Sequence, residues 1–239
     1  ELDGNREYSM LGETEEVNFK KEHKTGTSEE LFDFIADTIQ KYINKNREFI
    51  DEGKLLEFGF TWSFPVEQTG IASGTHIKWV KGWETKGVVG KDPVELLNAS
   101  LAKKGLSNVW INAMCNDTPG TKAVGDYLYS NCSGGAILGT GTNGSMSVKL
   151  KDIPKYKGSS TSTSDMMINM EWGAFNKSLS LTSFDQELDS ASKNPGEQTF
   201  EKMISGMYLG EITRLIFKDL ISQNRLFNGK SSVVLDKTL

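Results

Sequence analysis

Residues 109–129 read VWINAMCNDTPGTKAVGDYLY. The apolar run over residues 109–114 is typical of a buried strand, and Thr118 followed by Pro119 is typical of a helix start. Asn116 and Asp117 stand between these two elements, at the kind of junction where α/β sheets commonly bind ligands. This stretch therefore predicts an α/β fold with Asn116 and Asp117 at the ligand-binding edge of a sheet.

The rest of the chain also alternates between helix and strand patterns. Thr27 and Glu30 form a capping-box signature for a helix over residues 27–46, and Asp92 with Pro93 starts another over residues 93–104. A helix follows Pro119 toward residue 129, and apolar spacing predicts one long helix over residues 200–224. Strands are predicted at 55–62, largely buried, and at 76–80, 136–138, 146–150 and 166–170. The Ser/Thr-rich residues 159–164 are predicted to form a mobile surface loop.

Composition excludes several classes of protein. The 239 residues allow one or two domains, and 27 basic against 32 acidic residues give a net charge of −5 without a basic run. Nucleic acid is therefore not an expected partner. No apolar run approaches the ~20 residues of a membrane span. Two cysteines in a chain of this size favour a reducing, cytoplasmic compartment.

Asp117 has two interpretations. The positive end of the following helix favours an ionised carboxylate and also attracts phosphate, which suits a proton acceptor beside a phosphoryl donor. Alternatively, Asn116 and Asp117 only satisfy backbone groups of the turn and the helix start.

Residues 139–144, GTGTNG, match the spacing of a dinucleotide-binding motif, but residues 145–149 alternate like a strand instead of opening a helix. These glycines therefore predict a tight hairpin whose backbone lies close to a ligand. Gly229, Lys230 and Ser231 imitate the end of a P-loop, but Asn224 stands where that motif requires glycine.

The remaining candidates are isolated polar residues. Glu171 follows a strand and Glu201 lies in the first turns of a helix, so both could accept hydrogen bonds from hydroxyl groups in one cleft. Glu201 is alternatively a surface acid that compensates the helix dipole. His23 and His76 stand in no metal or triad pattern and are interpreted as structural. Cys115 is either a nucleophile or a small buried apolar residue.

Several segments in a fixed order carry a more specific signal. They are FTWSFPVEQ (60–68), GTHIKWVKGW (74–83), NDTPGT (116–121), GTGTNG (139–144), NMEWGAF (169–175) and NPGEQTFEKMISGMYLGE (194–211). Over about residues 26–223 this series resembles the eukaryotic hexokinase/glucokinase family. Another actin-like sugar or acetate kinase would explain GTGTNG, but not the NDT and EWGAF segments together.

The resemblance implies an α/β, actin-like ATPase (ribonuclease H-like) fold with two lobes around a sugar cleft. Residues 1–115 would belong to the small lobe and residues 116–239 to the first part of the large lobe. The implied reaction is transfer of the γ-phosphoryl group of ATP, bound with Mg²⁺, to the 6-hydroxyl of glucose or a related hexose, the first step of glycolysis.

The resemblance also implies roles for individual residues. Asp117 would be the general base, and residues 139–141 (Gly139, Thr140 and Gly141) would approach the ATP phosphates. The hexose would be bound by Ser63, Phe64, Pro65, Lys81, Asn116, Asn143, Glu171, Gln198 and Glu201. No protein-bound metal is expected, because Mg²⁺ would come with the nucleotide.

Two departures from the family pattern bear on function. Val80 stands where the family usually has threonine, which removes a hydroxyl from the sugar side. The family's first phosphate loop would precede Glu1, and its adenosine and second phosphate motifs would follow Leu239. The isolated chain is therefore expected to be inactive. A catalytically silent sugar-binding sensor is the alternative function, and the sequence leaves hexose preference and oligomeric state open.

Overall fold

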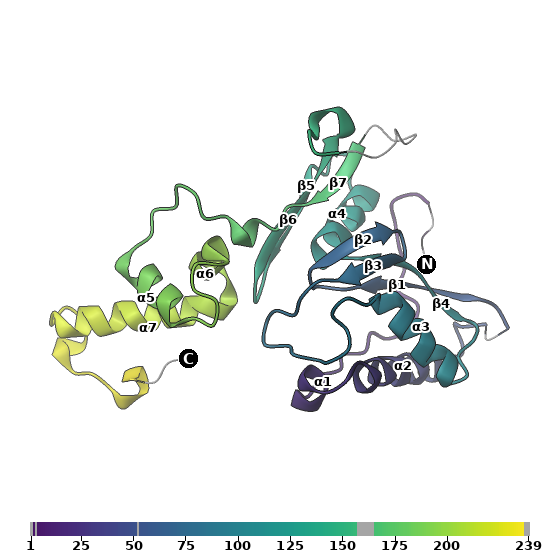
Figure 1. Cartoon of the computed structure of the whole chain (residues 1–239), viewed down its shortest axis with the longest axis horizontal. Helices are drawn as coiled ribbons and strands as arrows, with labels where there is room; N and C mark the ends of the chain where they lie inside the picture. Colours follow the sequence, from purple (N-terminus) through teal and green to yellow (C-terminus); the bar gives the residue numbers. More distant parts are fainter. Residues whose placement is uncertain (1, 3, 52, 157–164, 237–239) are drawn as a thin grey trace. The chain divides into compact units, whose positions relative to one another are not determined.

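The computed structural model describes residues 2, 4–51, 53–156 and 165–236. The chain divides into two compact units, Glu1–Gly120 and Thr121–Leu239 (Figure 1). The division falls inside helix α4 (Asp117–Leu128), whereas the expected boundary followed residue 115. The assignment of the units to a small and a large lobe stays a prediction. The predicted loop at residues 159–164 lies outside the described residues.

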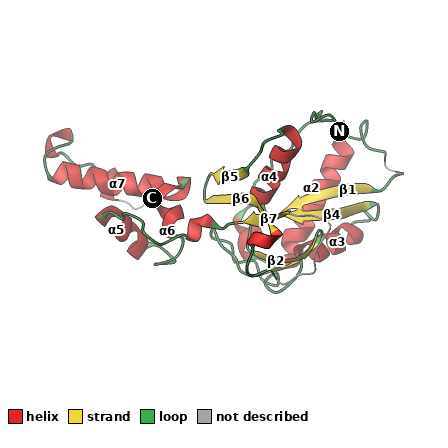
Figure 2. Ribbon diagram, turned by 90° about the horizontal axis from the view of Figure 1, so that it is seen from above, coloured by secondary structure: helices red, strands yellow, loops and turns green. Residues whose placement is uncertain are grey.

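Helices and strands occur in both units, as Figure 2 shows. No helix among the described residues is long and apolar enough to cross a membrane. The first unit contains, in chain order, α1 (Lys21–Thr25), α2 (Ser28–Lys45), β1 (Leu56–Thr61), β2 (Val66–Gly70), β3 (Ser73–His76), α3 (Pro93–Lys103) and β4 (Val109–Cys115), followed by the start of α4.

Two small sheets organise the first unit. Strands β1 and β4 pair in parallel, from Leu56 opposite Val109 to Thr61 opposite Cys115, and β2 pairs with β3 in antiparallel fashion. The prediction of a largely buried strand at 55–62 is correct in position but wrong in burial, because exposed and half-buried residues alternate along β1.

The predicted strand at 76–80 is wrong, since β3 ends at His76. The β2–β3 ladder reaches its last pair at Val66 and His76, next to Pro65. Pro65 has no N–H with which to continue the ladder, and its carbonyl accepts one bond from the Ile77 N–H at 2.9 Å. Lys81 and Gly82 then adopt positive φ angles of 58° and 77°, so the chain turns.

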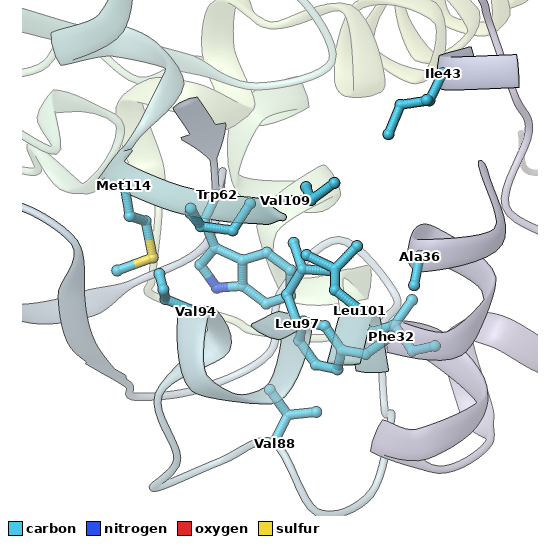
Figure 3. Packing of buried hydrophobic residues seen from close by; sticks show 12 residues of the cluster. Phe32, Ala36, Ile43, Trp62, Val88, Val94, Leu97, Leu101, Val109 and Met114 are labelled. Atoms are coloured by element: carbon cyan, nitrogen blue, oxygen red, sulfur yellow. The ribbon is translucent and has the colours of Figure 1, made fainter. Parts of the chain in front are cut away.

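The core of the first unit forms between α2, α3 and β4. Trp62, immediately after β1, stacks on Phe32 of α2 with ring centroids 5.9 Å apart (Figure 3). Burial of each large apolar side chain contributes roughly 1.5–3 kcal/mol. The buried residues of the three elements are Leu31, Phe32, Ala36 and Ile43 of α2, Val94, Leu97 and Leu101 of α3, and Val109, Ile111 and Met114 of β4.

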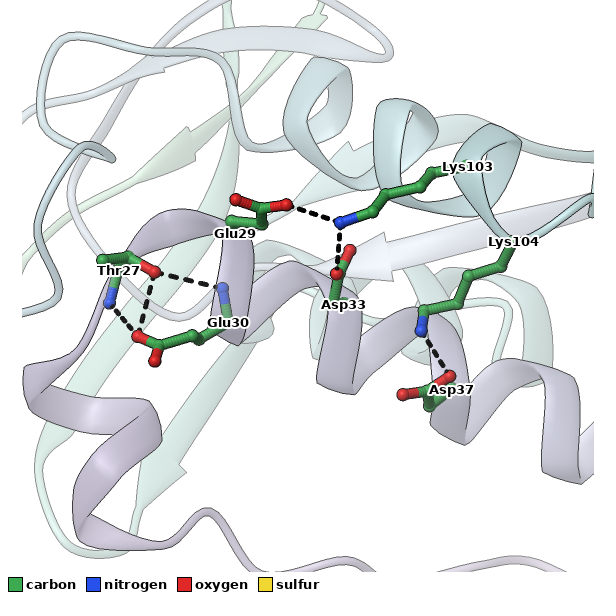
Figure 4. A network of polar contacts seen from close by, with 7 residues as sticks. All are labelled: Thr27, Glu29, Glu30, Asp33, Asp37, Lys103 and Lys104. Carbon is green, nitrogen blue, oxygen red and sulfur yellow. Dashed lines mark hydrogen bonds and ion pairs between the residues drawn. The ribbon is translucent and has the colours of Figure 1, made fainter.

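Polar contacts fix the start of α2 and its pairing with α3 (Figure 4). The predicted capping box is present: the Thr27 N–H donates to Glu30 Oε2 at 2.7 Å, and the Glu30 N–H donates to Thr27 Oγ1 at 3.3 Å. Lys103 of α3 binds Glu29 and Asp33 of α2, and its hydrogen bond holds the pKa of Asp33 below the ordinary value. These ion pairs lie at the surface, so each adds at most about 1 kcal/mol.

Acid is expected to destabilise the first unit through His76. Complete burial of His76 lowers its pKa from 6.5 to about 4. Between these two values the unfolded chain binds a proton that the folded chain does not. Stability is therefore fully present above pH 6.5 and falls, by up to about 3 kcal/mol, as the pH drops toward 4.

Urea unfolding followed by tryptophan fluorescence, at several pH values across this window, checks the His76 prediction. The His76→Leu variant has no titratable group at residue 76 and should show a flatter dependence of stability on pH. Equal pH dependence in the variant and the wild type would contradict the assignment.

The second unit combines a three-stranded antiparallel sheet with helices. The sheet contains β5 (Gly134–Leu138), β6 (Thr142–Lys149) and β7 (Asp165–Asn169), in that order. Helices α5 (Ser183–Ala191), α6 (Thr199–Ile204) and α7 (Gly206–Ser222) follow. Short 3₁₀ turns lie at Leu150–Asp152, Trp172–Ala174, Phe227–Gly229 and Val233–Asp236.

The predicted hairpin around GTGTNG is confirmed, with Leu138 opposite Thr142. The single helix predicted at 200–224 is wrong, because Ser205 is extended (φ −88°, ψ 155°) and separates α6 from α7. The N–H groups of Gly206 and Met207 donate to the carbonyls of Gly139 and Thr140, at 2.8 and 3.2 Å. The hairpin loop thus caps α7 and interrupts the helix.

Candidate functional site

Asn116 and Asp117 lie where β4 ends and α4 begins, as predicted. Asn116 Oδ1 accepts a hydrogen bond from the Thr118 N–H at 3.0 Å, which is the helix-start role of the structural interpretation. The carboxylate of Asp117, which is half-buried, accepts from the Thr118 hydroxyl at 3.2 Å. Since Thr118 is fully buried, it anchors the position of the Asp117 carboxylate.

The segment after β1 lies beside this junction. The backbone N–H of Trp62 donates to the Cys115 carbonyl at 2.8 Å. Ser63, the next residue after Trp62, therefore lies close to the segment that contains Asn116. Exposed Lys81 donates from Nζ to the Ser63 carbonyl at 3.4 Å. The first unit thus places Ser63, Phe64 and Pro65 on the segment after β1, with Lys81 on the turn that is bonded to it. Asn116 and Asp117 follow the end of the neighbouring strand, β4. Val80 is half-buried beside Lys81.

In the second unit, amide and carboxylate side chains meet across β6 and β7. Asn143 Nδ2 donates to Asn169 Oδ1 at 2.7 Å and to Glu171 Oε1 at 3.0 Å, and Asn169 Nδ2 donates to the same Glu171 oxygen at 2.8 Å. Glu171 is held in the left-handed region (φ 50°, ψ 44°). A pocket opens beside it, lined by Met170, Glu171, Trp172, Ala174, Phe175 and Phe200.

Asn169 is a member of this network that the sequence analysis missed. The usable signal was its position at the end of the predicted strand at 166–170, two residues before Glu171. In the observed register Asn169 pairs with Ser145 of β6, which brings its amide next to that of Asn143.

Glu201 holds the glycine-rich hairpin in place. Its Oε2 accepts a hydrogen bond from the Thr142 N–H at 2.9 Å, and a Cβ at Gly141 would lie only 2.4 Å from the same oxygen. Glu201 is half-buried, so the interpretation as a purely surface acid is too simple. A side chain at residue 141 would therefore displace the Glu201 carboxylate from its present position.

Gln198 precedes α6 in an unfavourable backbone conformation. It adopts the left-handed region (φ 53°, ψ 40°), and its Oε1 would lie 2.8 Å from a Cβ at Gly173. The same Cβ would lie 3.2 Å from the Cβ of Glu201, so Gln198 and Glu201 flank one glycine. Because Gly173 lies two residues after Glu171, the structure brings Glu171, Gln198 and Glu201 into one neighbourhood of the second unit.

A buried ion pair supports that neighbourhood. Lys202 Nζ, almost fully buried, donates to Asp189 Oδ1 at 2.6 Å and to the Asn194 carbonyl at 2.7 Å. Asp189 also accepts from the Gly196 N–H at 2.9 Å, and the Lys202 bond lowers its pKa. The turn that leads to Gln198 is therefore tied to α5 and α6.

The two histidines and the two cysteines are the remaining candidates. His76 is fully buried, and His23 stacks on Phe34 with ring centroids 4.0 Å apart. Cys115 and Cys132 are free, half-buried thiols. In the described part of the chain no group of three or more His, Cys, Asp or Glu side chains is placed to hold a metal ion.

Comparisons with known proteins agree with this architecture. Two hexokinase family models match, over residues 1–127 and 133–239. Hexokinase-2 of Oryza sativa subsp. japonica is 44% identical over 233 residues, 96% of this chain and 47% of that protein. Hexokinase-1 of Spinacia oleracea is 44% identical over 229 residues, 95% of this chain and 46% of that protein.

A solved structure is also similar. A hexokinase from Schistosoma mansoni complexed with glucose matches with a TM-score of 0.78 at 36% identity, covering 93% of this chain and 50% of that chain. The architecture is the α/β actin-like ATPase fold that the resemblance implied. The chain belongs to the hexokinase family. It spans about half the length of the curated relatives it matches.

Proposed function

We propose that this chain supplies the hexose-binding residues and the general base of an ATP-dependent hexokinase, which phosphorylates the 6-hydroxyl of glucose or a related hexose as the first step of glycolysis. The observation that carries the proposal is the position of Asp117, whose carboxylate lies at the carboxyl end of a parallel strand and at the first residue of a helix. The positive helix end favours the ionised carboxylate that a general base requires.

The proposed reaction is an in-line phosphoryl transfer. The hexose 6-oxygen forms a bond to the γ-phosphorus, the bond from that phosphorus to the β–γ bridging oxygen breaks, and ADP leaves. Asp117 accepts the hydroxyl proton during the attack. Magnesium bound to the nucleotide would neutralise charge on the phosphates. Gly139 and Thr140 are exposed, and residue 139 has no side chain to obstruct the close approach of a phosphate group.

Within the second unit, hexose recognition is proposed to use one hydrogen-bonded network of amide and carboxylate side chains. The Asn143, Asn169 and Glu171 network offers amide donors and carboxylate acceptors within a few ångströms of one another. Hydroxyl groups of a sugar both donate and accept, so such a set matches them. A site of this kind also rejects analogues that lack a hydroxyl, because its polar groups would then remain unpaired.

Hexose-dependent ADP release from MgATP tests the proposal, measured for this chain and for the longest protein that its gene encodes. Turnover that requires hexose is the expected result for the longer protein. Calorimetric binding of glucose without turnover in either form would favour the alternative, a catalytically silent sugar sensor. Neither binding nor turnover would contradict both functions.

Gly141→Ala is expected to weaken hexose binding about tenfold or more. The added methyl group displaces the Glu201 carboxylate, which lies 2.4 Å from its position, and breaks the bond to the Thr142 N–H. The carboxylate is the mobile end of its side chain, so the melting temperature should change by only a few degrees. Calorimetry with glucose in the absence of nucleotide measures the effect.

Gly139→Ala is the matched control in the same loop. A Cβ at residue 139 meets its nearest neighbour, Ile137, at 3.9 Å, which is ordinary contact. Glucose affinity should therefore match that of the wild type. Equal glucose affinities in the Gly141→Ala and Gly139→Ala variants would remove Glu201 from the proposed hexose-binding set.

A further inference from the structure

Trp62 and His76 form a hydrogen-bonded pair inside the aromatic core of the first unit. Trp62 Nε1 donates to His76 Nδ1 at 3.2 Å, and both side chains are buried. An indole N–H can only donate, so Nδ1 is the acceptor and the proton of the neutral imidazole resides on Nε2. In the described part of the chain Nε2 has no hydrogen-bond partner.

Stability alone does not explain this pair. A buried N–H without an acceptor lowers the stability of the fold, whereas two apolar side chains of similar shape would avoid that loss. The pair nevertheless determines geometry, because the hydrogen bond selects one orientation of the Trp62 indole and one tautomer of His76.

The pair contacts the segments that carry the hexose-binding candidates of the first unit. The Phe64 ring packs against Trp62 and His76, with centroid distances of 5.0 and 5.9 Å. The backbone N–H of Ile77, the residue after His76, donates to the Pro65 carbonyl at 2.9 Å. The backbone N–H of Trp62 donates to the Cys115 carbonyl. Ser63 and Phe64 therefore stand between two backbone anchors, each at or directly beside a member of the pair.

We propose that the hydrogen bond from Trp62 to His76 positions Ser63 and Phe64 for hexose binding. The inference rests on the proposed function, because it assigns these two residues to the hexose. Neither Trp62 nor His76 touches the substrate. Their bond prevents rotation of the indole, the fixed indole supports the Phe64 ring, and the ring keeps the backbone of residues 63–65 in the binding conformation.

The kinetic test compares two substitutions in the longest protein that the gene encodes. His76→Leu fills the space with an apolar side chain but leaves the indole N–H of Trp62 without its acceptor. We expect it to raise KM for the hexose about three- to tenfold, with kcat within about twofold of the wild type. His76→Asn places an amide oxygen near the position of Nδ1 and should restore KM to within about twofold.

His23→Leu is the matched control, since the chain contains only these two histidines and His23 packs on α2 at Phe34. It should leave KM for the hexose unchanged. Nitrogen-15 NMR of the two imidazole rings gives a readout independent of activity: His76 should carry its proton on Nε2 near neutral pH.

Each outcome decides the inference. Folded His76→Leu protein with wild-type KM, or a KM rise of equal size in His23→Leu, overturns it. A proton on Nδ1 of His76 overturns it even where His76→Leu fails to fold, and so does a His76→Asn variant that folds yet binds hexose no better than His76→Leu. Absence of hexose binding by the wild-type protein overturns the proposed function together with this inference.

Discussion

Replacing Asp117 by asparagine is expected to lower kcat for hexose phosphorylation by about 10²–10⁴-fold, the usual contribution of a positioned general base. Asparagine keeps the shape of the side chain and can still accept a hydrogen bond from the Thr118 hydroxyl, but it cannot accept the proton of the hexose 6-hydroxyl. KM for the hexose should change little. Steady-state kinetics with saturating MgATP measure both constants.

Asp152→Asn is a suitable control for the loss of one negative charge. Asp152 is exposed in the short turn after β6 and belongs to no candidate site. Its kcat should equal that of the wild type. A kcat for Asp117→Asn within about threefold of the wild type would show that another group accepts the proton.

Replacing Asp189 by alanine is expected to destabilise the second unit by about 2–4 kcal/mol. The substitution leaves the ammonium group of Lys202 buried, with the Asn194 carbonyl still bound to it at 2.7 Å. It also removes the acceptor of the Gly196 N–H and so frees the turn before Gln198. Weaker hexose binding should accompany the lower stability, measured by urea unfolding and by calorimetry.

The pH dependence of this pair follows from the lowered pKa of Asp189. Its stabilisation is present above the ordinary carboxyl pKa and is lost only as the pH falls through the lower value of the folded state.

Asp236→Ala is the control for Asp189→Ala, because the exposed pair of Lys218 and Asp236, 3.9 Å apart, should contribute less than about 0.5 kcal/mol. Similar losses of unfolding free energy in the Asp189→Ala and Asp236→Ala variants would contradict the role assigned to the burial of Lys202.

Local signals predicted the starts of α2 and α3 correctly. Thr27 and Glu30 satisfy N–H groups at the start of α2, Asp92 accepts a bond from the Val94 N–H, and Pro93 has no N–H that needs a partner, so no distant residue is needed to interpret these signals. The break at Ser205 was not predictable in this way. The apolar spacing continues through it, and the carbonyls that cap α7 belong to residues 139 and 140, far away in the sequence.

The candidate site shows the same division between local and distant information. The position of Asn116 and Asp117 follows from the strand and helix patterns around them. The roles of Asn169 and of the Trp62–His76 pair depend on strand register and on packing between segments, which periodicity does not reveal. Glu201 lies in the predicted helix start, but its bond to Thr142 joins residues 59 positions apart.

Phosphorus-31 NMR of the reaction between glucose and MgATP tests the central claim most directly. The longest protein that the gene encodes should produce ADP and a hexose phosphorylated at the 6-oxygen in equal amounts, and its Asp117→Asn variant should produce both far more slowly. Glucose bound by the wild-type protein without any phosphorylated hexose, or equal rates in the two proteins, would contradict a hexokinase that uses Asp117 as its base.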